Sequence, residues 1–283
     1  MTFDVDILLA TWNGERFLPA QLQSLLDQEY THWRLLAHDD GSSDSTRDIL
    51  RAFQSEHPER VKFFDDGVKF GSARDNFAYL LSHATAPYVM FCDQDDIWLP
   101  FKISLTREIM RLEETQKEGV PILVHSDLVV VNATGDILSS SFLASQRLPH
   151  AQSLLDAIVL NSVTGCTVML NRAAVDAGSP IPSQAIMHDW WLACRTLQCD
   201  GIVRLIELPT MHYRQHGGNA VGSKAIGLQF YLRRFASLPD VLSSMLAVIK
   251  QARALEVEYS TAVIVCAKLR HTLKRITKSG AGS

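Results

Sequence analysis

An α/β fold with a mostly parallel sheet is the class that this 283-residue sequence predicts, and three observations lead to it. Short apolar runs alternate with helical patterns through the first 120 residues, as expected when helices connect parallel strands. Hydrophobic residues make up 47% of the chain, which is enough for a large core. Glycine and proline together account for only 25 residues, which excludes collagen-like, low-complexity and disordered classes.

The first half of the chain consists of strand–helix pairs. The mainly apolar run at residues 5–10 predicts a buried strand, and the apolar residues of 15–28 recur at helical spacing. The same alternation predicts further strands at 33–37, 61–64 and 88–92 and helices at 44–55, 72–83 and 100–117. Pro100 suits the first turn of the last helix, because the N–H groups of a first turn have no partner within the helix.

The pattern changes after residue 120. Strands are expected at 122–126, 128–131, 163–170, 202–207 and 210–214, with a turn at 132–136. Helices are expected at 153–160 and 189–197, and from Gly217-Gly218 to the end of the chain with a break at Pro239. We therefore predict a single domain over residues 1–222, followed by a basic, amphipathic helical tail over residues 223–283.

The predicted tail differs in charge from the rest of the chain. It carries ten Lys or Arg residues against three Asp or Glu residues, a net charge of +7, so the preceding residues have a net charge of −11. Basic residues interleave with apolar ones at helical spacing, which is typical of a helix lying on an anionic membrane surface. A helical appendage packed on the domain, or an oligomerisation element, explains the same pattern, and the sequence leaves these alternatives open.

Composition also bears on partners and location. A net charge of −4 and a pI near 6.2 argue against a nucleic-acid partner. The five cysteines include no CxxC pair, which fits a reducing compartment. The start of the chain lacks the features of a signal peptide, and no apolar run approaches the roughly 20 residues that span a bilayer. We expect a cytoplasmic protein, peripheral at the inner face of the membrane if the tail binds lipid.

Three acidic clusters fall at the expected edges of strands and helices. DDGSSD at residues 39–44 follows the second strand, DQDD at 93–96 follows the fourth, and His188-Asp189 begins a Trp-rich helix. Open α/β sheets bind ligands beyond the carboxyl ends of their strands. Closely spaced carboxylates suit Mg²⁺ or Mn²⁺. Turn and helix-cap chemistry is the alternative for each cluster, because Asp also favours helix starts.

Several familiar signatures are absent from the sequence. It contains neither GxGxxG nor GxxxxGK[ST], so a dinucleotide-binding or P-loop protein has no motif support. It also lacks GxSxG, the motif of one common serine nucleophile.

The acidic clusters belong to an ordered set of motifs that resembles the family 2 inverting glycosyltransferases of the A-type (GT-A) fold. The set comprises ATWNGE at residues 10–15, DDGSSD at 39–44, DQDD at 93–96 and HDWW at 188–191. DQDDIW, together with YRQHGGN at 213–219, is most similar to the bacterial rhamnosyltransferase branch. The resemblance covers about residues 4–222, and its specificity lies in the order and spacing of motifs that are individually weak.

The resemblance implies roles for eight side chains. Nucleotide binding would fall to Thr11, Glu15, Asp40, Arg74 and Asp93, with Asp40 reading a pyrimidine base and Asp93 near the ribose. Asp95 would be the principal ligand of Mg²⁺ or Mn²⁺, and His216 would lie near the diphosphate or the metal. Asp189 would be the general base, and residues 161–166 would border the acceptor.

The implied activity is transfer of a sugar, rhamnose in this branch, from a dTDP- or UDP-sugar to a saccharide or lipid-linked acceptor in bacterial surface polysaccharide synthesis. The sequence departs from the family at Trp12, where Tyr is common, and at His188, where many relatives have Glu. A nucleotidyltransferase on a related sheet is an alternative, but residues 11–16 supply only one Arg for a triphosphate. A non-catalytic sugar-nucleotide-binding protein is another, and the intact Asp189 argues against it.

Overall fold

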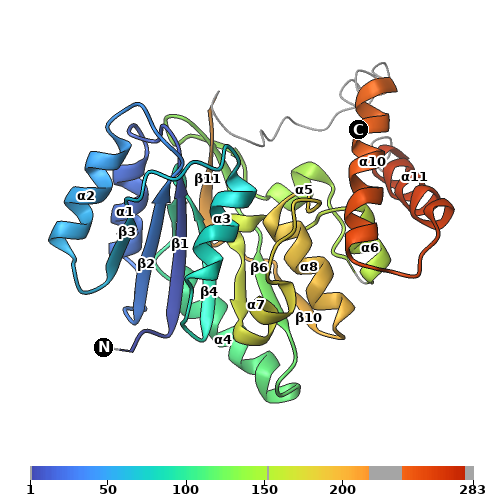
Figure 1. Cartoon of the computed structure of the whole chain (residues 1–283), viewed down its shortest axis with the longest axis horizontal. Coiled ribbons are helices and arrows are strands. Elements are labelled where there is room, and N and C mark those ends of the chain that lie inside the picture. The colour runs from blue at the N-terminus through green and yellow to red at the C-terminus, as the bar shows by residue number, and fades with distance from the viewer. Residues whose placement is uncertain (1, 152, 217–237, 278–283) are drawn as a thin grey trace.

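A seven-stranded sheet forms the centre of the molecule, in the order β10-β6-β9-β4-β1-β2-β3 (Figure 1). The computed structural model describes residues 2–151, 153–216 and 238–277. The strands of this sheet are β1 (Val5–Thr11), β2 (Trp33–Asp39), β3 (Val61–Phe64), β4 (Tyr88–Asp93), β6 (Ile122–Ser126), β9 (Met169–Asn171) and β10 (Ile202–Ile206). All neighbours pair in parallel except β9, which runs antiparallel to β4 and β6. The predicted mostly parallel α/β sheet is confirmed.

A smaller sheet, in the order β5-β11-β7-β8, accompanies the central one. Its strands are β5 (Ile97–Trp98), β7 (Val129–Asn132), β8 (Ile137–Ser139) and β11 (Met211–Gln215). The expected turn at 132–136 connects β7 to β8, where Asn132 Oδ1 accepts hydrogen bonds from the backbone N–H groups of Thr134 and Asp136. This sheet positions Tyr213 and His216 close to the DQDD segment, because β5 begins directly after Asp96.

Helices cover both faces of the central sheet. One face carries α1 (Leu18–Leu26), α2 (Thr46–Glu56) and α4 (Lys102–Gln116). The other carries α3 (Ala73–Ser82), α6 (Leu154–Val159), α7 (Arg172–Gly178) and α8 (His188–Gln198). The alternation of a strand explains the two cores: Val5, Ile7 and Leu9 of β1 face the first layer, whereas Leu8 faces the second.

Several elements differ from the sequence prediction. The expected strand at 163–170 is wrong over most of its length, because residues Gly165–Thr167 form a 3-10 turn and only Met169–Asn171 pair in the sheet. Short elements that the sequence did not indicate are β5, β8, α5 (Phe142–Gln146) and α7. Helices of five to seven residues contain too few turns for a clear apolar periodicity, which explains why α5 and α7 were missed.

The end of the described chain forms two helices, α10 (Leu238–Ala254) and α11 (Thr261–Thr277). Pro239 lies in the first turn of α10, where its missing N–H is tolerated, and the helical tail is also interrupted at residues 255–260, a break not predicted. Both helices contact α6, and they lie together at one end of the molecule (Figure 1). The boundary predicted at residue 222, and the helix expected immediately after Gly218, lie outside the described residues.

Candidate active site

The loops that follow β1, β2 and β4 meet at one edge of the central sheet. The strands are adjacent and in register: Thr11 pairs with Asp39, and Ala10 pairs with Asp93. A cavity of about 820 Å³ opens at this edge. Five of the side chains predicted to form the site line it, namely Thr11, Asp40, Asp93, Asp95 and Asp189. Glu15, Arg74 and His216 are not among the lining residues.

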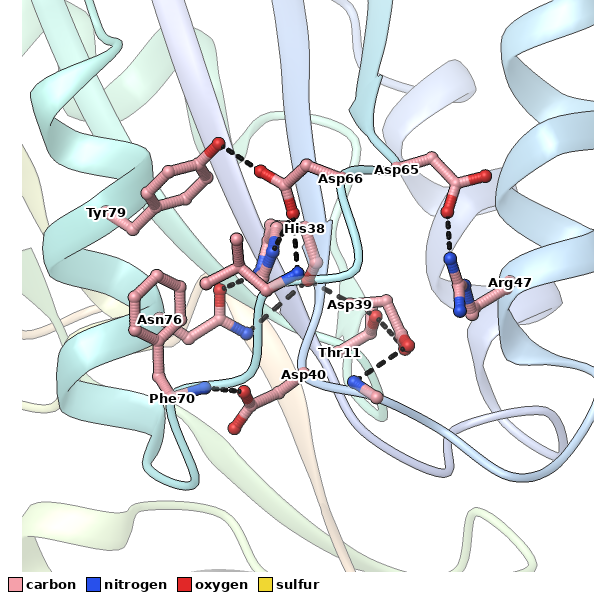
Figure 2. Close-up of polar contacts among 12 residues, drawn as sticks. Thr11, His38, Asp39, Asp40, Arg47, Asp65, Asp66, Phe70, Asn76 and Tyr79 are labelled. Carbon is pink, nitrogen blue, oxygen red and sulfur yellow. Dashed lines mark hydrogen bonds and ion pairs between the residues drawn. The ribbon is translucent and has the colours of Figure 1, made fainter.

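The two neighbouring acids of the second loop have different surroundings (Figure 2). Asp39 is occupied within the protein, because it accepts a hydrogen bond from the Thr11 hydroxyl at 2.9 Å. It also accepts one from the backbone N–H of Ser42 at 2.8 Å. Gly41 completes this turn with a φ of +83°, a conformation that favours glycine. Asp40 accepts a hydrogen bond from the Phe70 backbone N–H and lines the cavity. Of the pair, Asp40 is therefore the residue placed to meet a ligand.

Glu15 holds the first two loops together. Its carboxylate accepts a hydrogen bond from the Ser45 N–H at 2.9 Å, and its own N–H donates to Asp44 Oδ2 at 3.1 Å. Asn13 adds two further bonds between the loops, one to the Ser42 hydroxyl and one from the Ser43 N–H. The contact that the sequence implied between Glu15 and a nucleotide stays a prediction.

Near the end of β2, His38 joins this strand to α3 and to the segment after β3 (Figure 2). Its Nδ1 lies 2.8 Å from Asn76 Oδ1, and its Nε2 lies 3.3 Å from Asp66 Oδ1. The Tyr79 hydroxyl donates to the other oxygen of Asp66. His38 and Asn76 are buried, and their contact fixes the base of the loop that carries Asp40.

Arg74 braces the segment that leads to Asp189. Its guanidinium donates to the carbonyls of Ser183 and Ala185 at 2.8 and 2.9 Å, and it pairs with Asp75 at 2.8 Å. The Asp75 carboxylate beside it raises the pKa of Arg74 further. These bonds connect α3 to the loop before α8. The nucleotide contact that the resemblance implied for Arg74 stays a prediction.

The DQDD segment concentrates negative charge at the end of β4. Burial, together with the carboxylates of Asp95 and Asp189, raises the pKa of Asp93 to about 7. Burial, together with the carboxylates of Asp95 and Asp93, raises the pKa of Asp96 well above its usual range. Arg214 supports the segment, with its Nε donating to the Asp95 carbonyl at 3.0 Å and its backbone N–H to Asp96 Oδ1 at 3.2 Å. Such repulsion makes this the natural place for a cation.

The side chains present suit a divalent cation. His216 Nε2 lies 2.7 Å from Asp95 Oδ2, so the two predicted metal-site residues meet although they are far apart in the sequence. Ligand atoms of Asp93, Asp96 and Cys166 lie within 4.8 Å of one another. Burial raises the pKa of the Cys166 thiol. The other donors gathered here are the carboxylate oxygens of Asp93, Asp95 and Asp96 and the imidazole of His216. That donor set matches Mg²⁺ or Mn²⁺.

Asp189 lies in the first turn of α8 and faces the same cavity. Its carboxylate accepts hydrogen bonds from the backbone N–H groups of Trp190 and Gly165 and from Asn161. Burial nevertheless raises its pKa to about 6. A carboxylate with this pKa is mostly ionised at neutral pH and still accepts a proton readily, as a general base requires.

The neighbouring His188 packs its ring among aromatic side chains next to Asp189. Its ring lies between Phe77 and Phe91, with ring centroids 4.3 and 4.6 Å away. Burial lowers its pKa to about 3, so the imidazole is neutral. A β-carbon on Gly165 would lie 2.8 Å from His188 Nε2, so glycine permits the close approach of the 161–166 loop. The departure from Glu at this position therefore brings no second charge beside Asp189.

Two contributions to the cavity were not found by sequence reasoning. Gln94 binds the backbone of Trp12, accepting from its N–H at 2.8 Å and donating to its carbonyl at 2.9 Å. Arg275 of α11 lines the cavity from the tail. The sequence held a signal for Gln94, since it lies inside the DQDD motif, but none that connects Arg275 with residues so distant in the chain.

Comparisons with known proteins agree with this geometry. The family model described as Glycosyl transferase family 2 matches residues 6–176. The chain is 25% identical over 229 residues to the dTDP-rhamnosyl transferase RfbG of Shigella flexneri, covering 76% of this chain and 74% of the relative. It is 28% identical over 174 residues to the Escherichia coli UDP-Glc:alpha-D-GlcNAc-diphosphoundecaprenol beta-1,3-glucosyltransferase WfgD, covering 61% and 62% of the two chains.

Solved structures share the fold. The complex of S. aureus TarS 1-349 with UDP-GlcNAc superposes with a TM-score of 0.65 at 15% identity, covering 99% of this chain and 75% of that one. The mannosyltransferase PcManGT of Pyrobaculum calidifontis, in complex with GDP-Man and Mn²⁺, gives 0.56 at 14% identity, covering 99% and 84%. The expected GT-A fold is confirmed, and the chain belongs to glycosyl transferase family 2.

Proposed function

We propose that this glycosyltransferase is a metal-dependent inverting enzyme that moves rhamnose from a dTDP- or UDP-linked donor to a saccharide or lipid-linked acceptor in bacterial surface polysaccharide synthesis. One observation carries the proposal: Asp40, Asp93, Asp95 and Asp189, which come from the loops after β2 and β4 and from the start of α8, line a single cavity. The rhamnosyl and dTDP assignments are supported by the likeness to RfbG, and an undecaprenyl-diphosphate-linked acceptor by the likeness to WfgD.

In the proposed mechanism the donor lies along the loop edge of the sheet. Asp40 would accept a hydrogen bond from the N–H of the pyrimidine ring, and Thr11 and Asp93 would contact the rest of the nucleoside. Trp12 lines the cavity with an exposed indole, which offers a flat surface to the base. A divalent cation held by Asp95 and His216 would stabilise the charge that develops on the leaving diphosphate.

Asp189 would take the proton from the acceptor hydroxyl as the new glycosidic bond forms. Its pKa of about 6 suits this transfer near neutral pH. One base on the face opposite the leaving group inverts the anomeric carbon without a covalent intermediate. The nucleotidyltransferase alternative gains no support, since the first loop is occupied by bonds to the second rather than by a basic triphosphate cradle.

A thermal-shift screen with Mn²⁺ and a panel of nucleotide sugars tests the proposed donor. We expect dTDP-rhamnose to raise the melting temperature most, because a ligand that binds only the folded state stabilises it by mass action. UDP-glucose and GDP-mannose serve as controls for the base and the sugar. A larger shift with a different nucleotide sugar would overturn the rhamnosyl assignment, and indifference to every nucleotide would overturn the proposed transfer itself.

We also propose that the tail meets an anionic membrane surface. The inner faces of α10 and α11 pack on the domain through residues such as Val248, Ala252 and Ile264. Their outer faces expose Leu242, Leu246, Val263, Leu269 and Leu273, interspersed with the exposed cations Lys250, Arg253, Arg270 and Lys274. Exposed leucines beside basic residues are the composition of helices that lie in a lipid interface. No helix of the described part of the chain is long and apolar enough to cross a bilayer.

Vesicle co-sedimentation tests this contact. The double variant Leu269→Gln/Leu273→Gln should bind vesicles containing phosphatidylglycerol at least several-fold more weakly than the unaltered chain. Ile137→Gln/Leu138→Gln on β8 is the matched control, because these two side chains are at least as exposed but do not belong to the tail. Equal sedimentation of all three proteins would count against the membrane, and a change of oligomeric state in the tail variant would favour self-association instead.

A further inference from the structure

The tail reaches into the active-site cavity at one residue. Arg275, near the end of α11, is among the residues that line it. Its Nη2 donates to the carbonyl of Gln146, the last residue of α5, at 2.7 Å. The cavity therefore has a wall built from segments more than a hundred positions apart, α5 and α11.

The position of Arg275 is fixed by the helix face to which it belongs. Lys268, His271 and Arg275 follow one another at spacings of three and four residues, so they lie on the same side of α11. Lys268 Nζ donates to the carbonyl of Val159 at 2.6 Å, and His271 Nε2 lies 2.7 Å from Asp156 Oδ1. These contacts hold α11 against α6 and direct Arg275 toward the cavity.

The cavity is asymmetric in charge and polarity. Its acids come from the loop edge of the sheet and from α8, where the donor and the base are proposed to lie. Arg275 binds the end of α5, and this segment lines the cavity with Phe142, Gln146 and Leu148, so the wall beside Arg275 carries no acid. Among the described lining residues, Arg275 is the sole Lys or Arg. A guanidinium is always charged and binds carboxylate or phosphate through two parallel hydrogen bonds, so this wall suits a ligand that combines an anion with an apolar part.

We propose that Arg275 is an acceptor-binding residue that recognises an anionic group, a phosphate or a carboxylate, on the acceptor. The assignment rests on the proposed transferase function and adds the acceptor's charge to it. It also gives α11 a task in substrate selection that is separate from any contact with lipid.

Matched pairs of probes test this assignment in the full-length protein. Octyl glucuronide and octyl glucoside differ by one carboxylate, whereas geranyl diphosphate and geraniol differ by the diphosphate. Binding is followed by tryptophan fluorescence, because Trp12 and Trp190 line the cavity. EDTA is present, so that a metal at Asp95 does not capture the diphosphate. The variants are Arg275→Gln, Arg275→Lys and, as the control, Arg270→Gln, which removes the same charge from an exposed side chain of α11.

Arg275→Gln should weaken at least one anionic probe about tenfold, as expected for the loss of a charged hydrogen bond, and leave its neutral partner unchanged. Arg275→Lys should retain part of the affinity, and Arg270→Gln all of it. If Arg275→Gln weakens the binding of geranyl diphosphate alone, the acceptor carries a phosphate. If it weakens the binding of octyl glucuronide alone, the acceptor carries an acidic sugar. The assignment fails if both anionic probes bind Arg275→Gln normally, if the neutral probes fall in parallel, or if the unaltered chain does not prefer the anions.

A separate measurement distinguishes failure of this inference from failure of the proposed function. Binding of UDP and dTDP with Mn²⁺ is measured on the same variants. If the unaltered chain binds neither nucleotide, the proposed function is at fault. If nucleotide binding is normal and the anionic probes are insensitive to Arg275→Gln, only the role of Arg275 is wrong.

Discussion

Asp189→Asn is expected to lower sugar transfer by about 10²–10⁴-fold while the donor still binds, because an amide cannot take the proton of the acceptor hydroxyl. Asparagine keeps the size of the side chain and can still accept the N–H of Trp190. Transfer is measured with the donor found by the thermal-shift screen, and donor affinity is measured by titration. Asp176→Asn, an exposed acid on α7, is the control and should leave both quantities unchanged.

The same substitution should stabilise the protein at neutral pH. Burial raises the pKa of Asp189 from 3.8 to about 6, so keeping the carboxylate ionised costs free energy in the folded state. The cost is present in full above pH 6 and disappears as the pH falls toward 3.8, and the shift corresponds to at most about 3 kcal/mol. The melting temperature of Asp189→Asn should therefore exceed that of the unaltered protein by several degrees at pH 7 and by less at pH 4.5.

Two results would contradict this account of Asp189. Transfer that persists in Asp189→Asn would remove the residue from the role of base. A stability difference that is the same at pH 4.5 and pH 7 would show that the carboxylate is not ionised at a cost in the folded state.

Asp95→Asn should abolish the stabilisation that Mn²⁺ and a nucleotide produce together, and should reduce transfer by about a hundredfold or more. The residue offers its carboxylate to the cavity beside His216, and a neutral amide is a poor ligand for a hard cation. His216→Ala should have a smaller effect, on the order of 10–100-fold in metal affinity, as is typical when a partner of the principal ligand is lost. Metal titrations in the presence and absence of UDP or dTDP supply the measurement.

Asp48→Asn is the matched control for Asp95, because Asp48 is a highly exposed acid that pairs with Arg51 on the same helix. It should behave like the unaltered protein in every titration. Normal metal-dependent stabilisation of Asp95→Asn would show that the cation, if bound, is held elsewhere, with Asp93 and Asp96 as the next residues to test.

Much of the donor side of the site could be predicted from the sequence, because its residues lie directly after parallel strands. Asp39, Asp40 and Asp93 occupy the ends of β2 and β4, and the register of a parallel sheet brings such ends together. The local pattern of residues did not distinguish the role of Asp39 from that of Asp40, and only the family resemblance singled out Asp40. The two roles depend on which carboxylate is already hydrogen-bonded within the protein. The Thr11 hydroxyl donates to Asp39, which leaves Asp40 as the carboxylate that faces the cavity.

The acceptor side was harder to predict, because long-range packing rather than local pattern builds it. Phe142 and Arg275 reach the cavity from a five-residue helix and from α11, the last helix of the described residues. The Gly165–Thr167 turn resembles a strand in sequence, yet its backbone turns so that the Gly165 N–H can donate to Asp189. An interaction with a residue twenty-four positions later overrides the local preference for a strand.

The two hydrogen bonds between the Gln94 side chain and the Trp12 backbone reduce the conformational entropy that this loop has left to lose when a nucleotide binds. The Gln94 amide binds both the N–H and the carbonyl of Trp12, as a neighbouring β-strand would, although Trp12 lies in a loop. An exposed indole is thereby held ready at the mouth of the cavity before anything binds. Most of the ordering of this loop is thus completed during folding, so an arriving nucleotide has little more of it to freeze.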